Sequence, residues 1–530
     1  MPNRAPVACP LAALACLGLA FLVTETPAAE SRGAGPAATA AVAKPAVAAA
    51  STAASQTTSL PPAVAAIVSR SRLPAKSFAF EVRSVETGEL RPLLSFRADQ
   101  PVQLASTAKL VTSLAALDLL GPQHRWHTTA YSTALVSEGR LRGDLVLSGG
   151  PVGLTGNELR RWFVQLRQEG LLTIFGNIVL DNVALLHDRD PKQVKTTEDE
   201  RALDLPLDAR TYNQGKLVVS VRPTSGERAA VSVKPRPANV LVVNDVLMGG
   251  ACSAWAAWKR PEEIKSGPAL QLWVRGRWKA DCPGEDIAYV RPPAPVLLQP
   301  APGATTAPPI PAPRMVADLF AETGGSLRGI VVERDAAAPR PRQAQALSEL
   351  ATPVGEVLRE MNKTSNNEAA RNVLLSLAPG GDDAGGSGLK IGALKAAQER
   401  MRGWLRTQGL RDGDITVVLG SGQSRAERGR PRALVDLLRN AWRSADSQTL
   451  VDSLPIAGVD GTLIHRMTSG AATGQAYLKT GTLSDTRALA GYVRAKSGRV
   501  YAVSMVVTDP AAAKGTSALD SIVEWVARAG

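Results

Sequence analysis

The sequence predicts a mixed α/β (α+β) protein that combines antiparallel hairpins, amphipathic helices and a β-rich insert. Two hairpin patterns, at residues 78–96 and 489–507, predict pairs of antiparallel strands. Apolar residues at helical spacing predict helices after the first hairpin and at the C-terminus. The 530 residues suffice for two or three domains with a full hydrophobic core.

The N-terminal residues 1–29 have the pattern of a signal peptide. Arg4 supplies the positive end, an apolar stretch runs from Val7 to Val23, and small residues up to Ala29 offer a cleavage site. An uncleaved anchor is the alternative. The pattern predicts export to the periplasm. Residues 30–60 are rich in Ala, Thr and Pro and predict a disordered linker, because that composition cannot bury enough apolar surface.

A first helix is predicted at residues 61–71, followed by the strands of the first hairpin at residues 78–82 and 90–96. A helix with a broad apolar face follows up to Leu120, where Gly121 ends it. Because the apolar face is broad, we expect this helix to be buried on most sides.

Residues 144–339 form a long insert with short strands, which predict one or two β-containing domains. Within it, residues 291–314 are Pro-rich and predict an exposed loop. Further strands are predicted at residues 144–148, 178–181, 217–221, 240–243, 270–274 and 475–478. Further helices are predicted at residues 157–168, 315–323, 352–362, 368–377 and 393–408.

The chain has four cysteines, and their positions indicate whether an exported form could carry a disulfide. Cys9 and Cys16 lie in the predicted signal peptide and would be removed with it. Cys252 and Cys282 remain, and an even pair in an exported chain is compatible with a disulfide. Two buried free thiols are the alternative, because pairing cannot be deduced from sequence.

The formal net charge of +13 suits an anionic partner such as nucleic acid, acidic lipid or anionic wall polymer. No basic motif interleaved with aromatic residues is present, so no nucleic acid is expected, whereas peripheral association with a membrane stays open. The four histidines have no recognisable ligand spacing, and no C-x-x-C or H-E-x-x-H occurs. We therefore predict no metal and no other cofactor.

The chemistry is predicted to start from Ser106-Thr107-Ala108-Lys109. If the helix begins near Ser106, this serine and Lys109 lie one turn apart on one face. A serine hydroxyl is a weak nucleophile until a base takes its proton. A lysine amine can be that base once burial or nearby positive charge lowers its pKa.

Two later motifs accompany this one. Ser365-Asn366-Asn367 stands at a junction between two predicted helices, and Lys479-Thr480-Gly481 lies on a predicted strand. Each also has a purely structural alternative. Ser365 could cap the following helix, with Glu368 completing a capping box, and Lys479-Thr480-Gly481 could be an ordinary strand-to-turn sequence. The glycine of the third motif permits a ligand to approach the backbone closely.

The order S-x-x-K, S-x-N and K-T-G is that of the penicillin-recognising serine enzymes. The chain resembles the exported low-molecular-mass penicillin-binding proteins that are D-alanyl-D-alanine carboxypeptidases and endopeptidases and carry a large insert between the first two motifs. Residues 454–462 and 478–484 extend the resemblance. It implies a transpeptidase/β-lactamase-like core, an antiparallel sheet with helices on both sides, split between residues 61–143 and 340–530.

The resemblance implies catalytic roles for several of these residues. Ser106 attacks the carbonyl of the penultimate D-alanine, Lys109 takes its proton, and water later hydrolyses the acyl-enzyme. Ser365 relays a proton to the leaving amine, with Lys479 assisting electrostatically. The backbone N–H groups of Ser106 and Thr482 form the oxyanion hole.

Substrate-binding roles follow from the same resemblance. Asn367 holds the substrate amide, while Lys479 and Thr480 bind the terminal carboxylate next to Gly481 and Thr482. Peptidoglycan stem peptides are the implied substrates and β-lactam antibiotics the implied covalent inhibitors. Two other functions stay open at this point: a β-lactam hydrolase, which the absence of an E-x-x-L-N stretch disfavours, and a non-catalytic peptidoglycan-binding protein.

Residues 419–425 depart from the family pattern Asp-Gly-Ser-Gly-Leu-Ser-Arg. Leu419 replaces the acid and Gln423 replaces the leucine. Early in the insert, Gly150-Pro151-Val152-Gly153 lacks an aspartate that the resemblance leads us to expect. None of the three motifs is affected.

Overall fold

The computed structural model describes most of the chain after residue 59. The described residues are 60–89, 91–149, 156–181, 217–234, 241–259, 271–282, 284–290, 311–334, 345–379 and 393–530. The predicted signal peptide, nearly all of the predicted linker, and residues 150–153 lie outside them. In the described part, no helix is long and apolar enough to cross a membrane.

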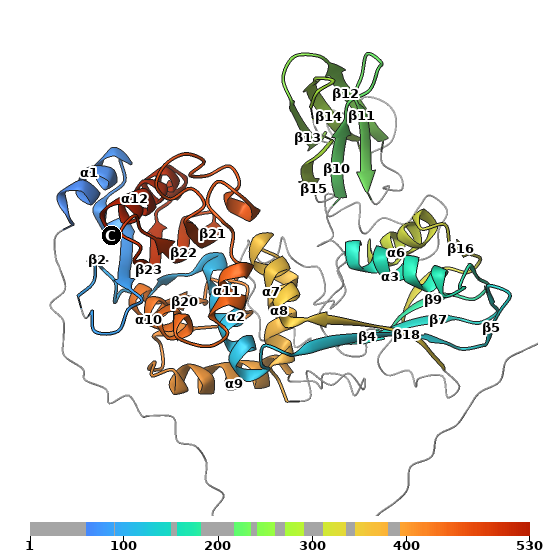
Figure 1. The fold of residues 1–530 in the computed structure, drawn as a ribbon, viewed down its shortest axis with the longest axis horizontal. Coiled ribbons are helices and arrows are strands. Elements are labelled where there is room, and N and C mark those ends of the chain that lie inside the picture. Colours follow the sequence, from blue (N-terminus) through green and yellow to red (C-terminus); the bar gives the residue numbers. More distant parts are fainter. Residues whose placement is uncertain are drawn as a thin grey trace, which may run out of the picture. The chain divides into compact units, whose positions relative to one another are not determined.

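A five-stranded antiparallel sheet joins the two ends of the described chain, in the order β2-β1-β23-β22-β21 (Figure 1). Both predicted hairpins are confirmed, because β1 pairs with β2 and β22 pairs with β23. The strands are β1 Phe78–Ser84, β2 Leu94–Phe96, β21 Ala476–Leu483, β22 Thr486–Arg494 and β23 Val500–Thr508.

Helices cover both faces of this sheet, as Figure 1 shows for α12 and α10. α1 (Pro62–Arg70) and α12 (Thr516–Ala529) pack on the face that carries Phe78, Phe80 and Met505. The opposite face, with Ala490 and Tyr492, belongs to a core shared with six helices. These are α2 Ala108–Leu119, α7 Val354–Lys363, α8 Asn367–Ser376, α9 Ala393–Thr407, α10 Pro431–Trp442 and α11 Ser447–Ser453.

Short elements complete this part of the chain. A small three-stranded sheet is formed by β3 Val102–Gln103, β19 Ile415–Thr416 and β20 Arg428–Gly429. Single 3-10 turns are η1 Ala75–Ser77, η2 Ala105–Thr107, η6 Gly461–Leu463 and η7 Ala512–Gly515. The turn η2 leads directly into α2, so the first motif stands at the start of a helix, as predicted.

A second five-stranded sheet has the order β17-β9-β7-β4-β18. Its members are β4 Arg125–Ser132, β7 Leu145–Gly149, β9 Ile178–Asp181, β17 Val331–Arg334 and β18 Gln345–Pro353. β4 precedes the predicted insert and β18 follows it, so this sheet spans both predicted boundaries, at residues 143 and 340. The division into domains stays a prediction.

Helices α3 (Gly156–Gln168) and α6 (Pro311–Glu322) share a core with this sheet. α6 corrects one expectation: its first residues, 311–314, belong to the segment predicted as a Pro-rich loop. Proline suits the first turn of a helix, where its missing N–H has no partner to lose. A four-stranded sheet accompanies them, formed by β5 Val136–Ser137, β6 Arg140–Leu141, β8 Thr173–Ile174 and β16 Ser326–Leu327.

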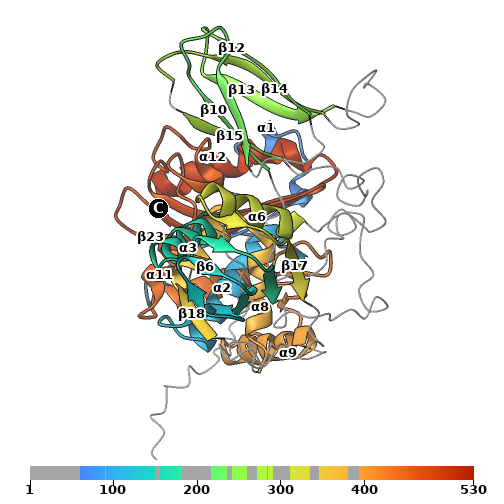
Figure 2. The same cartoon turned by 90° about the vertical axis from the view of Figure 1, so that its right-hand side faces the viewer.

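The remaining strands form two three-stranded sheets around one small core (Figure 2). One has the order β11-β10-β15, and the other pairs β12 and β13 with the central β14. Their bounds are β10 Leu217–Arg222, β11 Ala230–Lys234, β12 Leu241–Met248, β13 Ser253–Trp258, β14 Gln271–Trp278 and β15 Glu285–Val290. The β-rich character predicted for the insert is confirmed.

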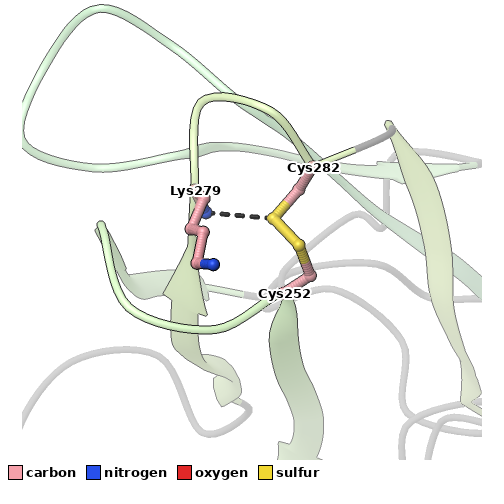
Figure 3. Close-up of a disulfide and its surroundings, with 3 residues drawn as sticks. All are labelled: Cys252, Lys279 and Cys282. Carbon is pink, nitrogen blue, oxygen red and sulfur yellow. Dashed lines mark hydrogen bonds between the residues drawn. A yellow bond between two sulfur atoms is a disulfide. The ribbon is translucent and has the colours of Figure 1, made fainter.

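A disulfide joins Cys252 and Cys282 beside these sheets (Figure 3). The Cα atoms lie 5.7 Å apart, and the backbone N–H of Lys279 donates to the Cys282 Sγ at 3.1 Å. The pair left open by the sequence is therefore a cross-link, and the alternative of two free thiols is wrong.

Candidate active site

The serine of the first motif lies in a strained turn that leaves it partly accessible. Ala105, immediately before it, is fully buried with φ +45°, a conformation that non-glycine residues rarely adopt. Ser106 itself is partly exposed. Thr107 fixes the turn, because its Oγ1 donates to the Leu104 carbonyl at 2.6 Å. The turn therefore presents the Ser106 hydroxyl while its neighbours on both sides are buried.

The Lys109 side chain is completely buried and has three polar neighbours. Its Nζ lies 3.0 Å from the Ser106 Oγ, and it donates to the Asn367 Oδ1 and to the Ser421 carbonyl, both at 2.6 Å. The first contact lies within the first motif, and the second reaches the second motif. The third reaches a loop that precedes β20.

The electrostatic surroundings favour an unprotonated Lys109. Burial lowers the pKa of Lys109 well below its usual value, and the nearby positive charge of Lys479 lowers it further. The Glu427 carboxylate acts in the opposite direction, and Arg371 adds to the lowering. A neutral amine has two N–H donors and one lone pair. Two acceptors lie at Asn367 and Ser421, so the lone pair is left for the hydroxyl of Ser106.

Ser365 lies between α7 and α8 with φ +58°, again an uncommon backbone conformation. Its Oγ accepts from the Lys479 Nζ at 2.9 Å. The helix cap is a different residue, because the Asn366 Oδ1 accepts the backbone N–H of Ala369 at 3.0 Å. Ser365 is thus turned toward the third motif, and the capping role considered for it falls to its neighbour.

The third motif lies on β21, as predicted. Lys479 is completely buried, and burial lowers its pKa from the usual 10.5 to about 7. Its Nζ also donates to the Thr480 carbonyl at 2.8 Å, and the Thr480 Oγ1 lies 2.8 Å from the Thr462 Oγ1. Thr482 is exposed. The Lys479 amine, the Thr480 hydroxyl and the exposed Thr482 therefore follow one another along one strand.

A glycine lets β21 approach the serine turn closely. A Cβ at Gly481 would lie 3.0 Å from the Ala105 Cβ and 3.1 Å from the Leu104 carbonyl oxygen. The third motif is therefore packed against the first. The structure brings together the predicted residues Ser106, Lys109, Ser365, Asn367, Lys479, Thr480 and Gly481 from three separate parts of the chain. The oxyanion hole assigned to Ser106 and Thr482 stays a prediction.

The loop at residues 417–422 supplies contacts that the motifs did not predict. Leu419 is buried, and the carboxylate that binds this loop comes from Glu427. A Cβ at Gly422 would lie 1.7 Å from the Ala105 carbonyl oxygen, so this position accepts no side chain. Backbone groups have no sequence signature, and these contacts could be recognised only from the folded chain.

Across the described residues, the His, Cys, Asp and Glu side chains form no group of three or more that could hold a metal ion.

The family model for D-Ala-D-Ala carboxypeptidase 3 (S13) matches residues 60–529. The chain belongs to this family. It is therefore a serine-type D-Ala-D-Ala carboxypeptidase, and the resemblance drawn from the three motifs is confirmed.

Individual relatives agree with this assignment. The chain is 28% identical over 436 residues to the D-alanyl-D-alanine carboxypeptidase of Actinomadura sp. strain R39, covering 78% of this chain and 75% of the relative. The crystal structure of penicillin binding protein 4 (dacB) from Haemophilus influenzae matches with a TM-score of 0.56 and 19% identity, covering 87% of this chain and 99% of that one. The same protein complexed with a novel β-lactam gives a TM-score of 0.53, at 19% identity and with the same coverage. These matches confirm the predicted fold class.

Proposed function

We propose that this carboxypeptidase removes the terminal D-alanine of peptidoglycan stem peptides through an acyl-enzyme on Ser106. One observation carries the proposal: Lys109 Nζ lies 3.0 Å from the Ser106 Oγ and has two acceptors, at Asn367 and Ser421, for its N–H groups. A buried, unprotonated amine in these contacts is a base directed at one hydroxyl.

In the acylation step, the Ser106 Oγ attacks the carbonyl carbon of the penultimate D-alanine while its proton passes to Lys109 Nζ. The carbonyl oxygen becomes an oxyanion, which backbone N–H groups at Ser106 and Thr482 would stabilise. The amide bond then breaks, and the leaving amine takes a proton from Ser365. Lys479, 2.9 Å from the Ser365 Oγ, replaces that proton or stabilises the charge that develops.

The terminal carboxylate distinguishes this substrate from an internal peptide bond. Lys479 and Thr480 lie next to each other on β21, and a protonated Lys479 with the Thr480 hydroxyl would hold one carboxylate. Binding an anion beside Lys479 also favours the protonated form of this buried amine. Recognition of the carboxylate and assistance to the leaving group are thus coupled through one side chain.

Deacylation completes the cycle when water attacks the ester carbonyl: the proton of the water goes to the Ser365–Lys479 pair, which gave one up during acylation, and the Ser106 Oγ leaves with the proton held on Lys109. Penicillin presents a strained amide to the same nucleophile, and opening of its ring leaves the amine attached to the acyl group. The leaving group cannot diffuse away, so we propose that penicillin acylates Ser106 and is released slowly. The β-lactam complex of the structurally similar H. influenzae protein supports this proposal.

We propose that D,D-cross-links are cleaved as well. The bond in such a cross-link is the same D-alanyl amide, with a larger amine as the leaving group, so no other chemistry is required. We also propose that the enzyme acts in the periplasm. The signal-like sequence of residues 1–29 and the Cys252–Cys282 disulfide support export, because disulfides persist mainly in oxidising compartments.

One digestion experiment tests the proposal. The purified full chain is incubated with a soluble pentapeptide ending in D-Ala-D-Ala and, separately, with a purified cross-linked muropeptide dimer, and the products are weighed by mass spectrometry. We expect loss of one alanine from the first and separation of the second into monomers. Ser106→Ala should abolish both. Turnover that persists in Ser106→Ala would contradict the proposed mechanism.

A further inference from the structure

Glu427 is a buried carboxylate that none of the three motifs includes. Its side chain is 1% exposed. The Oε1 atom accepts backbone N–H groups of Val418, Leu419 and Gly420 at 3.0, 2.9 and 2.6 Å, and the Oε2 atom accepts that of Gly422 at 2.6 Å. One side chain therefore fixes the backbone of an entire loop.

A single peptide group joins Glu427 to Lys109. The carbonyl of Ser421 accepts from the Lys109 Nζ at 2.6 Å, and the N–H of Gly422, which belongs to the same peptide group, donates to Glu427 at 2.6 Å. A peptide group is planar, so fixing its N–H also fixes the direction of its carbonyl. Hydrogen bonds in such a chain also polarise one another.

The backbone of Glu427 is bound to the other side of the site. Its carbonyl accepts the N–H of Leu104 at 3.4 Å, and the next residue, Arg428, pairs with Gln103 in the small sheet. Leu104 precedes the strained turn that carries Ser106. Glu427 therefore connects the segment that leads into the nucleophile with the loop that binds its base.

We propose that Glu427 is a positioning residue of the acylation step: through the Ser421–Gly422 peptide it holds the Lys109 amine with its lone pair toward the Ser106 hydroxyl. The inference rests on the proposed roles of Ser106 and Lys109. If the Ser421 carbonyl turned away, the amine could rotate and donate an N–H to the hydroxyl, and it could no longer accept the proton.

The charge of Glu427 has a second consequence. Three charged groups from different elements act on this amine in addition to burial. Burial and the positive charges of Lys479 and Arg371 lower the pKa of Lys109, whereas Glu427 raises it. Removing the charge at Glu427 therefore lowers the pKa of Lys109 further. The rate of acylation rises with pH as the base loses its proton, and we call this rising part of the pH profile the acid limb. In a variant with a neutral residue at position 427, the acid limb should lie at lower pH.

Stopped-flow acylation by a chromogenic or fluorescent penicillin across pH tests the inference. Glu427→Gln keeps the shape but turns an N–H₂ group toward backbone donors. We expect the acylation rate constant, measured at pH values above the acid limb, to fall about 10- to 100-fold. This is less than the roughly 10²- to 10³-fold cost of losing a hydrogen bond made directly to the reacting group, because Glu427 acts through a peptide group. The acid limb should move to lower pH.

Glu427→Asp separates charge from geometry. It keeps the carboxylate but shortens its reach, so the rate should fall while the acid limb stays near its wild-type position. Glu81→Gln is the matched control, because Glu81 is also a fully buried glutamate and its partners, Arg83 and Arg432, belong to the sheet and α10. This control should acylate at the wild-type rate.

Outcomes for this inference and for the proposed function are distinct. Absence of Ser106-dependent acylation in the wild-type protein would defeat the proposed function. Wild-type acylation with unchanged rate and acid limb in Glu427→Gln would overturn the positioning role alone. If Glu427→Gln does not fold, a wild-type rate in Glu427→Asp would overturn it equally.

Discussion

The Nζ of Lys109 lies 2.6 Å from the Oδ1 of Asn367, although 258 positions separate the two residues in the chain. This contact joins the first motif to the second across the whole insert. It also takes one of the two N–H groups of a neutral amine. Because the Ser421 carbonyl takes the other, the orientation of the base is fixed before any substrate binds.

Replacing Lys109 with Met should remove acylation while preserving the fold. We expect the penicillin acylation rate to fall by about three orders of magnitude, within the range of general-base catalysis. The free energy of unfolding should fall by no more than about 1–3 kcal/mol, because Met removes a buried amine but leaves the acceptors at Asn367 and Ser421 without its N–H groups. Rapid-mixing kinetics and thermal unfolding measure the two effects. Lys514→Met, on a lysine outside the site, is the control, and a normal rate in Lys109→Met would exclude this residue as the base.

The value of kcat/KM should decrease as the pH rises through about 7. Lys479 has a pKa of about 7 because of burial, so below this pH it is protonated and can bind the terminal carboxylate, and above it that charge is lost. The parameter kcat/KM reports groups of the free enzyme. The decline should therefore be seen with a D-Ala-D-Ala peptide assayed from pH 5 to 9.

An arginine at position 479 provides the comparison, since its guanidinium stays protonated over this range. Lys479→Arg should be slower at its optimum but should lack the decline near pH 7. A decline that persists unchanged in this variant would assign it to another group.

Gly422→Ala should reduce acylation more than it reduces the stability of the fold. Its Cβ would lie 1.7 Å from the Ala105 carbonyl oxygen, so the loop or the serine turn must move. Gly498 has φ +85°, close to the +81° of Gly422, but nothing lies within 4 Å of its Cβ position. Gly498→Ala therefore controls for backbone strain. We expect acylation to be lost in Gly422→Ala and retained in Gly498→Ala, and equal rates would show that the close approach does not matter.

Removing the disulfide should destabilise the β-rich insert without changing the chemistry. Cys252 and Cys282 are 30 positions apart, and loop-closure entropy for such a loop predicts a loss of about 3.5 kcal/mol when both are replaced by Ser. Hydrogen exchange should report faster opening of residues 241–258 and 271–278. The rate on a soluble D-Ala-D-Ala peptide should be unchanged. Exchange identical to the wild type would mean that the cross-link does not constrain these sheets.

The sequence alone was sufficient to predict functional contacts between residues that are close together in the chain. Ser106 and Lys109 lie one helical turn apart, and this follows from their positions alone. Likewise, the order of the three motifs was enough to predict that distant residues share one site. The elements of the central sheet were also predicted, because alternating and helical apolar patterns are strong local signals.

Features that depend on distant backbone could not be predicted in this way. The partners of Glu427 are backbone N–H groups, which any residue supplies. Ser365 and Asn366 are both good cap residues, and Asn366 takes the cap while Ser365 binds Lys479, 114 positions later in the chain. Pairing of β4 with β18 likewise crosses the whole insert.

Intact-protein mass spectrometry after incubation with benzylpenicillin tests the central claim most directly, namely that Ser106 is a nucleophile activated where the three motifs meet. We predict a single covalent adduct with the mass of the antibiotic, located by peptide mapping on the segment that contains Ser106, and no adduct in Ser106→Ala. An adduct on another residue, or an unmodified wild-type protein, would contradict the account.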